Sequence, residues 1–342
     1  MRHLPLGVAL LLAGCATPAV SPPVENVAVP AVAETEPVAS ADDAADDPAI
    51  WRNPRDPARS LVVATDKQAG IHVYDLSGKR LSYTPAPRLN NVDLREAGGR
   101  IIVAASDRAD ETQAHVSLFA LDPATARLRE LGRFPVGAGE AYGMCLWRRT
   151  RDAALFGFVV LKDGRIGEVS IEASGAGTPV VRTVRSMKLG TQSEGCVVDD
   201  RTGQLYVAEE DVGLWRFDAD PAAPITPTSI ARVDGRTLVA DAEGLAIAPA
   251  GRRGGYLVVS SQGDNAYTLY RLPDVRYAGR FRIAGGAIDG TSDTDGIDLM
   301  LGNFGPAFPG GLMVAQDGNN APATQNFKYV SWAAVRRALH LN

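Results

Sequence analysis

Histidine and cysteine are scarce in this sequence, and their scarcity excludes several classes of hydrolase. There are four histidines in 342 residues and no Arg-His-Gly motif, so neither a histidine phosphatase nor a multi-histidine zinc site is expected. Cys145 and Arg151 have the separation of a cysteine phosphatase loop. The residues between them are bulky, whereas such a loop needs small residues whose backbone N–H groups face phosphate. The sequence also lacks a Gly-x-Ser-x-Gly elbow and a Walker loop.

An excess of positive charge is also missing. The formal net charge is −5, which argues against nucleic acid as a partner because phosphate backbones are held by Lys and Arg patches. A polyanionic substrate would therefore need local basic residues or bound cations.

The longest apolar run at the N-terminus, residues 4–13, is too short to cross a bilayer as a mature helix. It is followed by Leu12-Ala13-Gly14-Cys15, which resembles a bacterial lipobox. We therefore expect residues 1–15 to be a lipoprotein signal peptide, with Cys15 lipidated and the membrane reached by this anchor only. The alternative is an ordinary cleaved signal. Because Ala16 rather than Asp follows the cysteine, an exported protein anchored at the outer membrane, on its periplasmic face or surface, is expected.

The rest of the chain divides into three parts. Residues 16–40 are rich in Pro, Ala, Val and Glu and predict a flexible tether. Residues 41–333 form the predicted folded domain, and residues 334–342 a tail with at most a short helical turn. Cys145 and Cys196 could in number form one disulfide, but both lie in apolar runs and are expected to be buried free thiols. We expect a monomer.

An internal repeat predicts the fold. Runs of alternating or continuous apolar residues, typical of β-strands, recur six times in groups of three. The first run of each group begins 44 to 52 residues after the previous one. This period, built from strands and turns, indicates an all-β, six-bladed β-propeller. The alternatives are a β-sandwich, which does not explain the period, and a β-helix, whose repeat is shorter. The six groups begin at Asp47, Asn91, Tyr142, Glu194, Glu243 and Asp295.

Oxygen-bearing residues gather at the predicted channel mouth. Strands next to the channel would bring the first residues of the groups together, and the carboxylates among them would repel one another if left bare. Ca²⁺ takes six to eight oxygen ligands in flexible geometry and would resolve this repulsion. Further acidic segments lie at equivalent ends, which adds Asp293, Asp298, Asp317 and Asn319 as candidate ligands. Taken singly, each of these segments could be a solvated turn.

Basic residues occur in the same register. Lys67, Arg108 and Lys162 stand beside Asp66, Asp107 and Asp163 at the ends of equivalent strands. Together they could line the mouth, and cations beside bound calcium suit a phosphate-rich ligand.

At these positions the sequence resembles the calcium-dependent β-propeller phytases, which have 3-phytase-like activity. The resemblance extends from about Asp42 to Trp332. It is carried by Asp-Asp-Pro-Ala-Ile-Trp (46–51), Leu-Asn-Asn-Val-Asp (89–93), Ser-Glu-Gly (193–195), Ala-Glu-Glu-Asp (208–211), Val-Ala-Gln-Asp-Gly (314–318), Gln-Asn-Phe-Lys (325–328) and above all the ten residues 289–298, Asp-Gly-Thr-Ser-Asp-Thr-Asp-Gly-Ile-Asp.

The resemblance implies several calcium ions and two adjacent phosphate sites, one for cleavage and one for holding. It implies phosphate-site roles for Lys67, Arg108, Tyr142, Lys162 and Asp163. It implies calcium or water-holding roles for Asp47, the Val92 carbonyl, Glu194, Glu210, Asp241, Glu243, Asp295 and Gly296. Two departures stand out, because Gln68 and Asp107 occupy positions where the family often has lysine and asparagine.

The expected function is calcium-dependent release of phosphate from phytate (myo-inositol hexakisphosphate) and lower inositol phosphates by metal-activated water. Two alternatives remain open. A calcium propeller lactonase or esterase would need a histidine base near one channel calcium. A non-catalytic binding propeller would show no turnover and no tight calcium.

Overall fold

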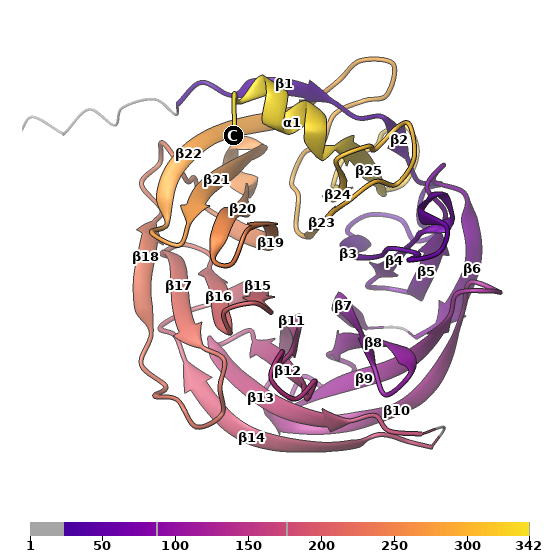
Figure 1. The fold of residues 1–342 in the computed structure, drawn as a ribbon, viewed down its shortest axis with the longest axis vertical. Helices are drawn as coiled ribbons and strands as arrows, with labels where there is room; N and C mark the ends of the chain where they lie inside the picture. The colour runs from indigo at the N-terminus through magenta and orange to yellow at the C-terminus, as the bar shows by residue number, and fades with distance from the viewer. Residues whose placement is uncertain (1–23, 87, 176, 342) are drawn as a thin grey trace, which may run out of the picture.

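Six β-sheets are arranged around a central axis, and one end strand of each sheet lies nearest the axis (Figure 1). The structure is a computed structural model that describes residues 24–86, 88–175 and 177–341. The six sheets are the blades of a β-propeller, which confirms the predicted fold. The expected signal peptide and its lipidated Cys15 lie outside the described residues.

Each of the first four blades is a meander of four antiparallel strands. The fifth blade has four such strands and a parallel fifth, and the sixth has three with a fourth from the N-terminus. The strands of the blades, in chain order, are β3 (Ala45–Trp51), β4 (Leu61–Asp66), β5 (Gly70–Tyr74), β6 (Arg80–Pro85); β7 (Leu89–Ala97), β8 (Arg100–Asp107), β9 (Gln113–Asp122), β10 (Arg127–Ala138); β11 (Ala141–Arg148), β12 (Leu155–Leu161), β13 (Arg165–Glu172), β14 (Val180–Lys188); β15 (Ser193–Asp199), β16 (Gln204–Glu209), β17 (Gly213–Asp218), β18 (Thr228–Arg232); β19 (Ala242–Ala250), β20 (Gly254–Ser261), β21 (Ala266–Leu272), β22 (Arg276–Ala284); β23 (Ile297–Leu301), β24 (Gly311–Asp317), β25 (Asn326–Ser331). Short 3₁₀ turns cover Pro57–Arg59 and Gln262–Asp264.

The second strand of each blade is a buried run rich in Val, Ile, Leu and Ala, which suits a strand covered on both faces. Its side chains pack against the neighbouring blade. Val63 and Val73 of the first blade, for example, share a core cluster with Val103 and Phe119 of the second. The core is therefore a ring of interfaces between blades, and it fixes the inner strands around the axis.

The N-terminal segment closes this ring. The sequence predicts a tether over residues 16–40, but β1 (Val27–Pro30) pairs with β22, and β2 (Ala33–Glu34) pairs with β25. The described part of the expected tether is thus built into the last two blades. Its apolar residues explain this, since Val29 and Val38 are buried. The sequence did not predict these strands, because residues 16–40 show no alternation of apolar and polar residues.

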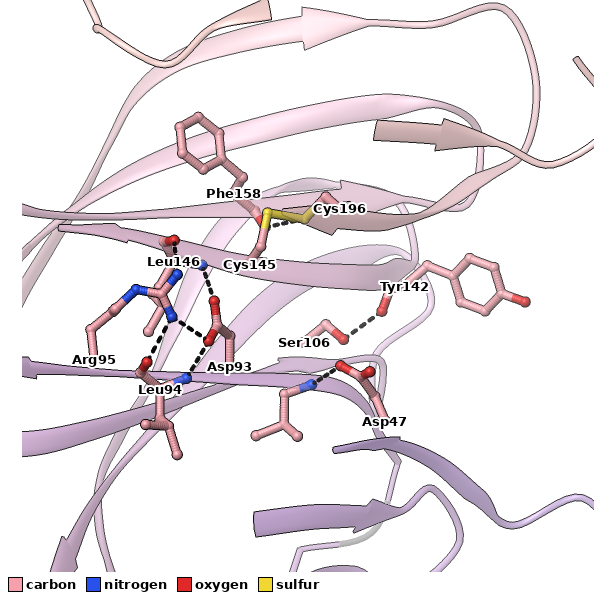
Figure 2. The surroundings of a disulfide bond; sticks show 11 residues. Asp47, Asp93, Leu94, Arg95, Ser106, Tyr142, Cys145, Leu146, Phe158 and Cys196 are labelled. Atoms are coloured by element: carbon pink, nitrogen blue, oxygen red, sulfur yellow. Dashed lines mark hydrogen bonds and ion pairs between the residues drawn. A yellow bond between two sulfur atoms is a disulfide. The ribbon is translucent and has the colours of Figure 1, made fainter. Parts of the chain in front are cut away.

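A disulfide joins two neighbouring inner strands, which corrects the prediction of free thiols. Cys145 of β11 is bonded to Cys196 of β15, with the two Cα atoms 5.7 Å apart (Figure 2). Both cysteines are buried, as predicted. The sequence did not show that two residues 51 positions apart occupy facing positions in adjacent blades.

The chain ends in a short helix, α1 (Trp332–Ala338), whose Trp332 and Val335 pack beside β1 and β22. The expected helical turn in the tail is therefore present, and it begins at Trp332. Among the described residues, no helix has the length and apolar character needed to cross a membrane.

Candidate active site

The inner strands meet at the channel mouth through direct backbone contacts. The Gly296 N–H donates to the Asp46 carbonyl, and the Gly244 N–H donates to the Asp295 carbonyl. The next contact round the ring is equally close, because a Cβ on Gly195 would lie 2.3 Å from the Glu243 carbonyl oxygen. Glycine is required where backbones approach so closely. Glu194, Glu243 and Asp295 precede these glycines, so three successive blades each bring a carboxylate to the mouth.

This geometry corrects the register predicted for the first blade. The sequence analysis aligned Asp47 with Glu194, Glu243 and Asp295, but Asp46 is the equivalent residue, and Asp47 stands where the other strands have glycine. Asp46 was missed because two adjacent aspartates left the choice open. Strand pairing resolves the choice. Pro48 lies opposite Ala64 of β4, as Leu245 lies opposite Val259 of β20, so Asp46 is the equivalent of Glu243.

Three buried glutamates form the centre of the site. Glu194, Glu210 and Glu243 each offer a carboxylate oxygen, and these oxygens lie within 4.8 Å of one another. Within the described chain, Glu210 Oε1 and Glu243 Oε2 are buried without a hydrogen-bond partner. Gln192 donates to the other oxygen of Glu210, and Asn90 donates to Glu194 Oε1, each at 2.8 Å. The sequence placed all three glutamates in the site, and the structure brings them together.

Burial and mutual repulsion raise the pKa of each glutamate. Burial is the larger cause of the rise in the pKa of Glu194 and Glu243, and neighbouring carboxylates add to it. The pKa of Glu210 rises to about 7, from burial first and then from the nearby charge of Asp241. The pKa of Asp241 is itself raised by burial and by Asp211. Carboxylates in this state need a cation or protons to offset their charge.

Lys67 occupies a second part of the mouth. Its ammonium lies 2.7 Å from Asp43, 3.3 Å from Asp46 and 3.2 Å from Asp295. These carboxylates raise its pKa although burial opposes the change. Burial raises the pKa of Asp295 to about 7, with Lys67 acting in the opposite direction. Lys67 is therefore fixed as a cation where the sixth and first blades meet.

Tyr142 lies between two further cations. The Arg108 guanidinium carbon is 5.8 Å from the centre of its ring, and Lys162 Nζ is 5.2 Å away. Burial, followed by the charges of Glu194 and Glu243, raises the pKa of the Tyr142 hydroxyl. Of the predicted phosphate-site residues, Arg108 and Lys162 thus lie beside Tyr142, and Lys67 lies beside Asp46 and Asp295.

Asp163 does not join this group. It pairs with Arg165 at 2.7 Å, and its side chain is half exposed. The two departures from the family pattern also have local partners. Asp107 binds Arg133 and Ser117, and Gln68 donates to the carbonyls of Ala41 and Asp43. Gln68 therefore supports the loop that carries the Asp43 partner of Lys67.

Several predicted metal ligands lie within the channel. Asp47 and Asp298 line a cavity of about 50 Å³ together with Asp93 and Arg95. The Asp47 carboxylate accepts the Val92 N–H, and Asp298 accepts the N–H groups of Ile50 and Leu299. Figure 2 shows that the Asp93 carboxylate accepts hydrogen bonds from the Arg95 guanidinium and from the Leu146 N–H.

The remaining predicted ligands form a separate group on the sixth blade. The buried Asp317 is paired with the buried ammonium of Lys328 at 3.3 Å, and it accepts the N–H groups of Ser292 and Asn319. Asp293 is exposed beside Gly318. Gly296 places its carbonyl in the β23–β24 region, where it accepts the Gln316 N–H. Within the described residues no contact joins Asp293, Asp317 or Asn319 to the glutamate cluster, whereas Gly296 lies at the mouth beside Asp46. The metal roles of all four residues stay predictions.

The donor set at the mouth fits a hard cation. Carboxylate oxygens are the preferred ligands of Ca²⁺. Glu194, Glu210 and Glu243 converge, and two of their oxygens have no other partner among the residues described. Asp46 adds two more buried oxygens that accept no hydrogen bond within the same ranges. Glu210 Oε1 and Glu243 Oε2 could therefore bind such an ion without displacing a hydrogen bond, whereas Asp46 already lies 3.3 Å from the Lys67 ammonium.

Comparison with known proteins agrees with this geometry. A family model described as Phytase matches residues 6–342. The chain is 41% identical over 325 residues to the 3-phytase of Bacillus subtilis (strain 168), covering 91% of this chain and 85% of that protein. A chain in the crystal structure of a mitotic checkpoint complex aligns with 96% of this chain and over 87% of its own length. The identity is 13% and the TM-score is 0.49, so no argument rests on this similarity. By family model and relative together, this chain belongs to the phytase family.

Proposed function

We propose that this protein is a calcium-dependent phosphomonoesterase that releases phosphate from phytate and lower inositol phosphates. Membership of the phytase family and the similarity to a 3-phytase support the substrate. The observation that carries the calcium dependence is the convergence of Glu194, Glu210 and Glu243, with buried oxygens left unpaired in the described chain.

The cations of the mouth bind and orient the substrate. Lys67 lies beside Asp295, Arg108 and Lys162 lie beside Tyr142, and all three would present positive charge to phosphate oxygens. In phosphoryl transfer this charge offsets the negative charge that develops on the equatorial oxygens. Tyr142 keeps its proton because its pKa is raised, so its hydroxyl can donate a hydrogen bond to a phosphate oxygen.

Glu194, Glu210, Glu243 and Asp295 would hold calcium, with Asp46 beside them. When bound, calcium supplies positive charge and Lewis acidity at the phosphate. Until then the protein carries carboxylates whose pKa is raised by burial. The remaining predicted ligands, Asp47, the Val92 carbonyl, Asp241, Asp293, Gly296, Asp298, Asp317 and Asn319, would serve further ions or support these residues.

The lactonase alternative is not favoured by the positions of the histidines. His72 is buried between Tyr74 and Tyr83, and His115 contacts the Gln113 carbonyl. No histidine in the described ranges contacts the glutamate cluster. The non-catalytic alternative leaves the cations around the cluster unexplained.

We further propose that the protein is exported and anchored by a lipid on Cys15. The lipobox supports the anchor, and the Cys145–Cys196 disulfide supports an oxidising compartment. Mass spectrometry of the mature N-terminus would test it. A lipid mass on Cys15 is expected, and an unmodified cysteine would contradict the anchor.

A single assay separates the functions. Phosphate release from phytate is measured with saturating calcium and then with excess chelator. Calcium-dependent release is expected. Release that persists in chelator would contradict the calcium role, and no release in either condition would favour the lactonase or the binding protein over a phytase.

A further inference from the structure

We propose that Arg88 is a specificity-determining residue that binds a phosphate of the substrate outside the cluster of Lys67, Arg108 and Lys162. The proposal rests on the phytase function proposed above. Arg88 was not among the site residues predicted from the sequence. It lies in the turn between β6 and β7, immediately before the inner strand of the second blade.

Backbone hydrogen bonds join the main chain of Arg88 to the main chains of two cationic residues of the site, Lys67 and Arg108. Its N–H donates to the Lys67 carbonyl at 3.1 Å, and its own carbonyl accepts the Arg108 N–H at 3.0 Å. Its φ is +73°, a value that few residues other than glycine adopt. The chain is thus held in an uncommon conformation at the point where it joins the loops that carry Lys67 and Arg108.

The guanidinium of Arg88 is available to a ligand. Its side chain is 44% exposed, and its ion-pair partner in the described part of the chain is Glu111, at 2.5 Å, whose side chain is 65% exposed. Exposed ion pairs of this kind contribute little to stability, so a phosphate can replace Glu111 at small cost. Lys67, by contrast, is 10% exposed and already has three carboxylate partners.

The chemistry of the substrate supplies the ligand. Phytate has six phosphates on one ring, and the three cations of the mouth cannot neutralise all of them. Phosphates that do not occupy the cleavage and holding positions must face the outer edge of the mouth, here called the rim, which includes the turn that carries Arg88. A guanidinium binds phosphate oxygens in a bidentate manner, and Arg88 is the rim residue joined by backbone bonds to both Lys67 and Arg108. It would favour highly phosphorylated rings over lower inositol phosphates.

Three variants of the full chain test this inference at saturating calcium. Arg88→Gln should raise KM for phytate about tenfold with kcat unchanged, since it removes binding shared by the ground and transition states. Glu111→Gln should lower KM, because it frees Arg88. Arg129→Gln, which removes an exposed arginine from the outer strand β10 of the same blade, is the charge-matched control and should change neither constant.

A second substrate separates this role from a general structural one. An inositol bisphosphate with two adjacent phosphates has none left for the rim, so its inhibition constant against phytate hydrolysis should be the same for Arg88→Gln and the unaltered protein. Equal KM for phytate in both proteins, or equal weakening of both ligands, would overturn the inference. Absence of phosphate release by the unaltered protein would instead refute the proposed function.

Discussion

Two groups of carboxylates line the axis of this propeller, and they are stabilised differently. Within the channel, Asp93 accepts the Leu146 N–H and pairs with Arg95, and Asp298 accepts two backbone N–H groups. At the mouth, Glu210 and Glu243 keep buried oxygens without a partner in the described chain. Buried polar groups are normally satisfied. The channel group therefore fixes one blade to the next, whereas the mouth group is arranged for a ligand that the protein does not supply.

The two groups should respond oppositely to substitution. Removing a channel carboxylate leaves backbone donors and an arginine unsatisfied, which lowers stability. Removing a mouth carboxylate relieves repulsion in the calcium-free protein, so its stability should rise while activity is lost.

The largest effect is expected for Glu194→Ala and Asp295→Ala. Each removes a carboxylate that would hold calcium, so phosphate release from phytate at saturating calcium should fall about 1000-fold. Stabilisation by calcium in thermal unfolding should disappear as well. Glu130→Ala, an exposed position on β10, is the control. Unchanged hydrolysis in both site variants would contradict the assignment of the mouth.

The next effect concerns Asp46, which the sequence analysis did not select. Asp46→Asn removes the negative charge that pairs with Lys67 and one of the two oxygens available to a cation, so kcat/KM should fall about 100-fold, equivalent to about 2.7 kcal/mol. Asp47→Asn keeps an oxygen that can accept the Val92 N–H and should cost less activity. A larger loss in Asp47→Asn would show that the corrected register is wrong.

A smaller effect, on stability alone, is expected in the channel. Asp93→Asn weakens its bond to Arg95, which retains Asp200 as a partner. The free energy of unfolding should fall by about 2 kcal/mol. Chemical denaturation measures this change, and the calcium concentration for half-maximal activity should not move. A shift in that concentration would mean that the two groups are coupled.

The smallest effect is on pH dependence. In the calcium-free protein the pKa of Glu210 and of Asp295 is raised to about 7. A raised carboxyl pKa favours the folded state fully below the ordinary value of about 4, and this contribution is lost as the pH rises through 7. With chelator, the unfolding temperature should therefore fall by on the order of 3 °C between pH 5 and pH 8. With calcium the difference should vanish, and an equal fall in both conditions would count against ligand binding at these carboxylates.

The repeat of strand runs was sufficient to predict six blades, because strand alternation and blade length are local properties. Glu194, Glu243 and Asp295 were found because each begins one of the six repeated groups of strand runs. Asp46 was missed because Asp47, rather than the glycine of the third to sixth blades, follows it, and only strand pairing separates the two aspartates. The disulfide, the ring closure by β1 and β2, and the position of Arg88 depend on contacts between distant segments, which no local pattern records.

The central claim is that the mouth carboxylates are a calcium site, and a crystal structure of the full chain grown with calcium tests it most directly. The account predicts an ion bound by oxygens of Glu194, Glu210 and Glu243 at about 2.3–2.6 Å. Crystals at saturating calcium in which these three carboxylates surround no ion would contradict it.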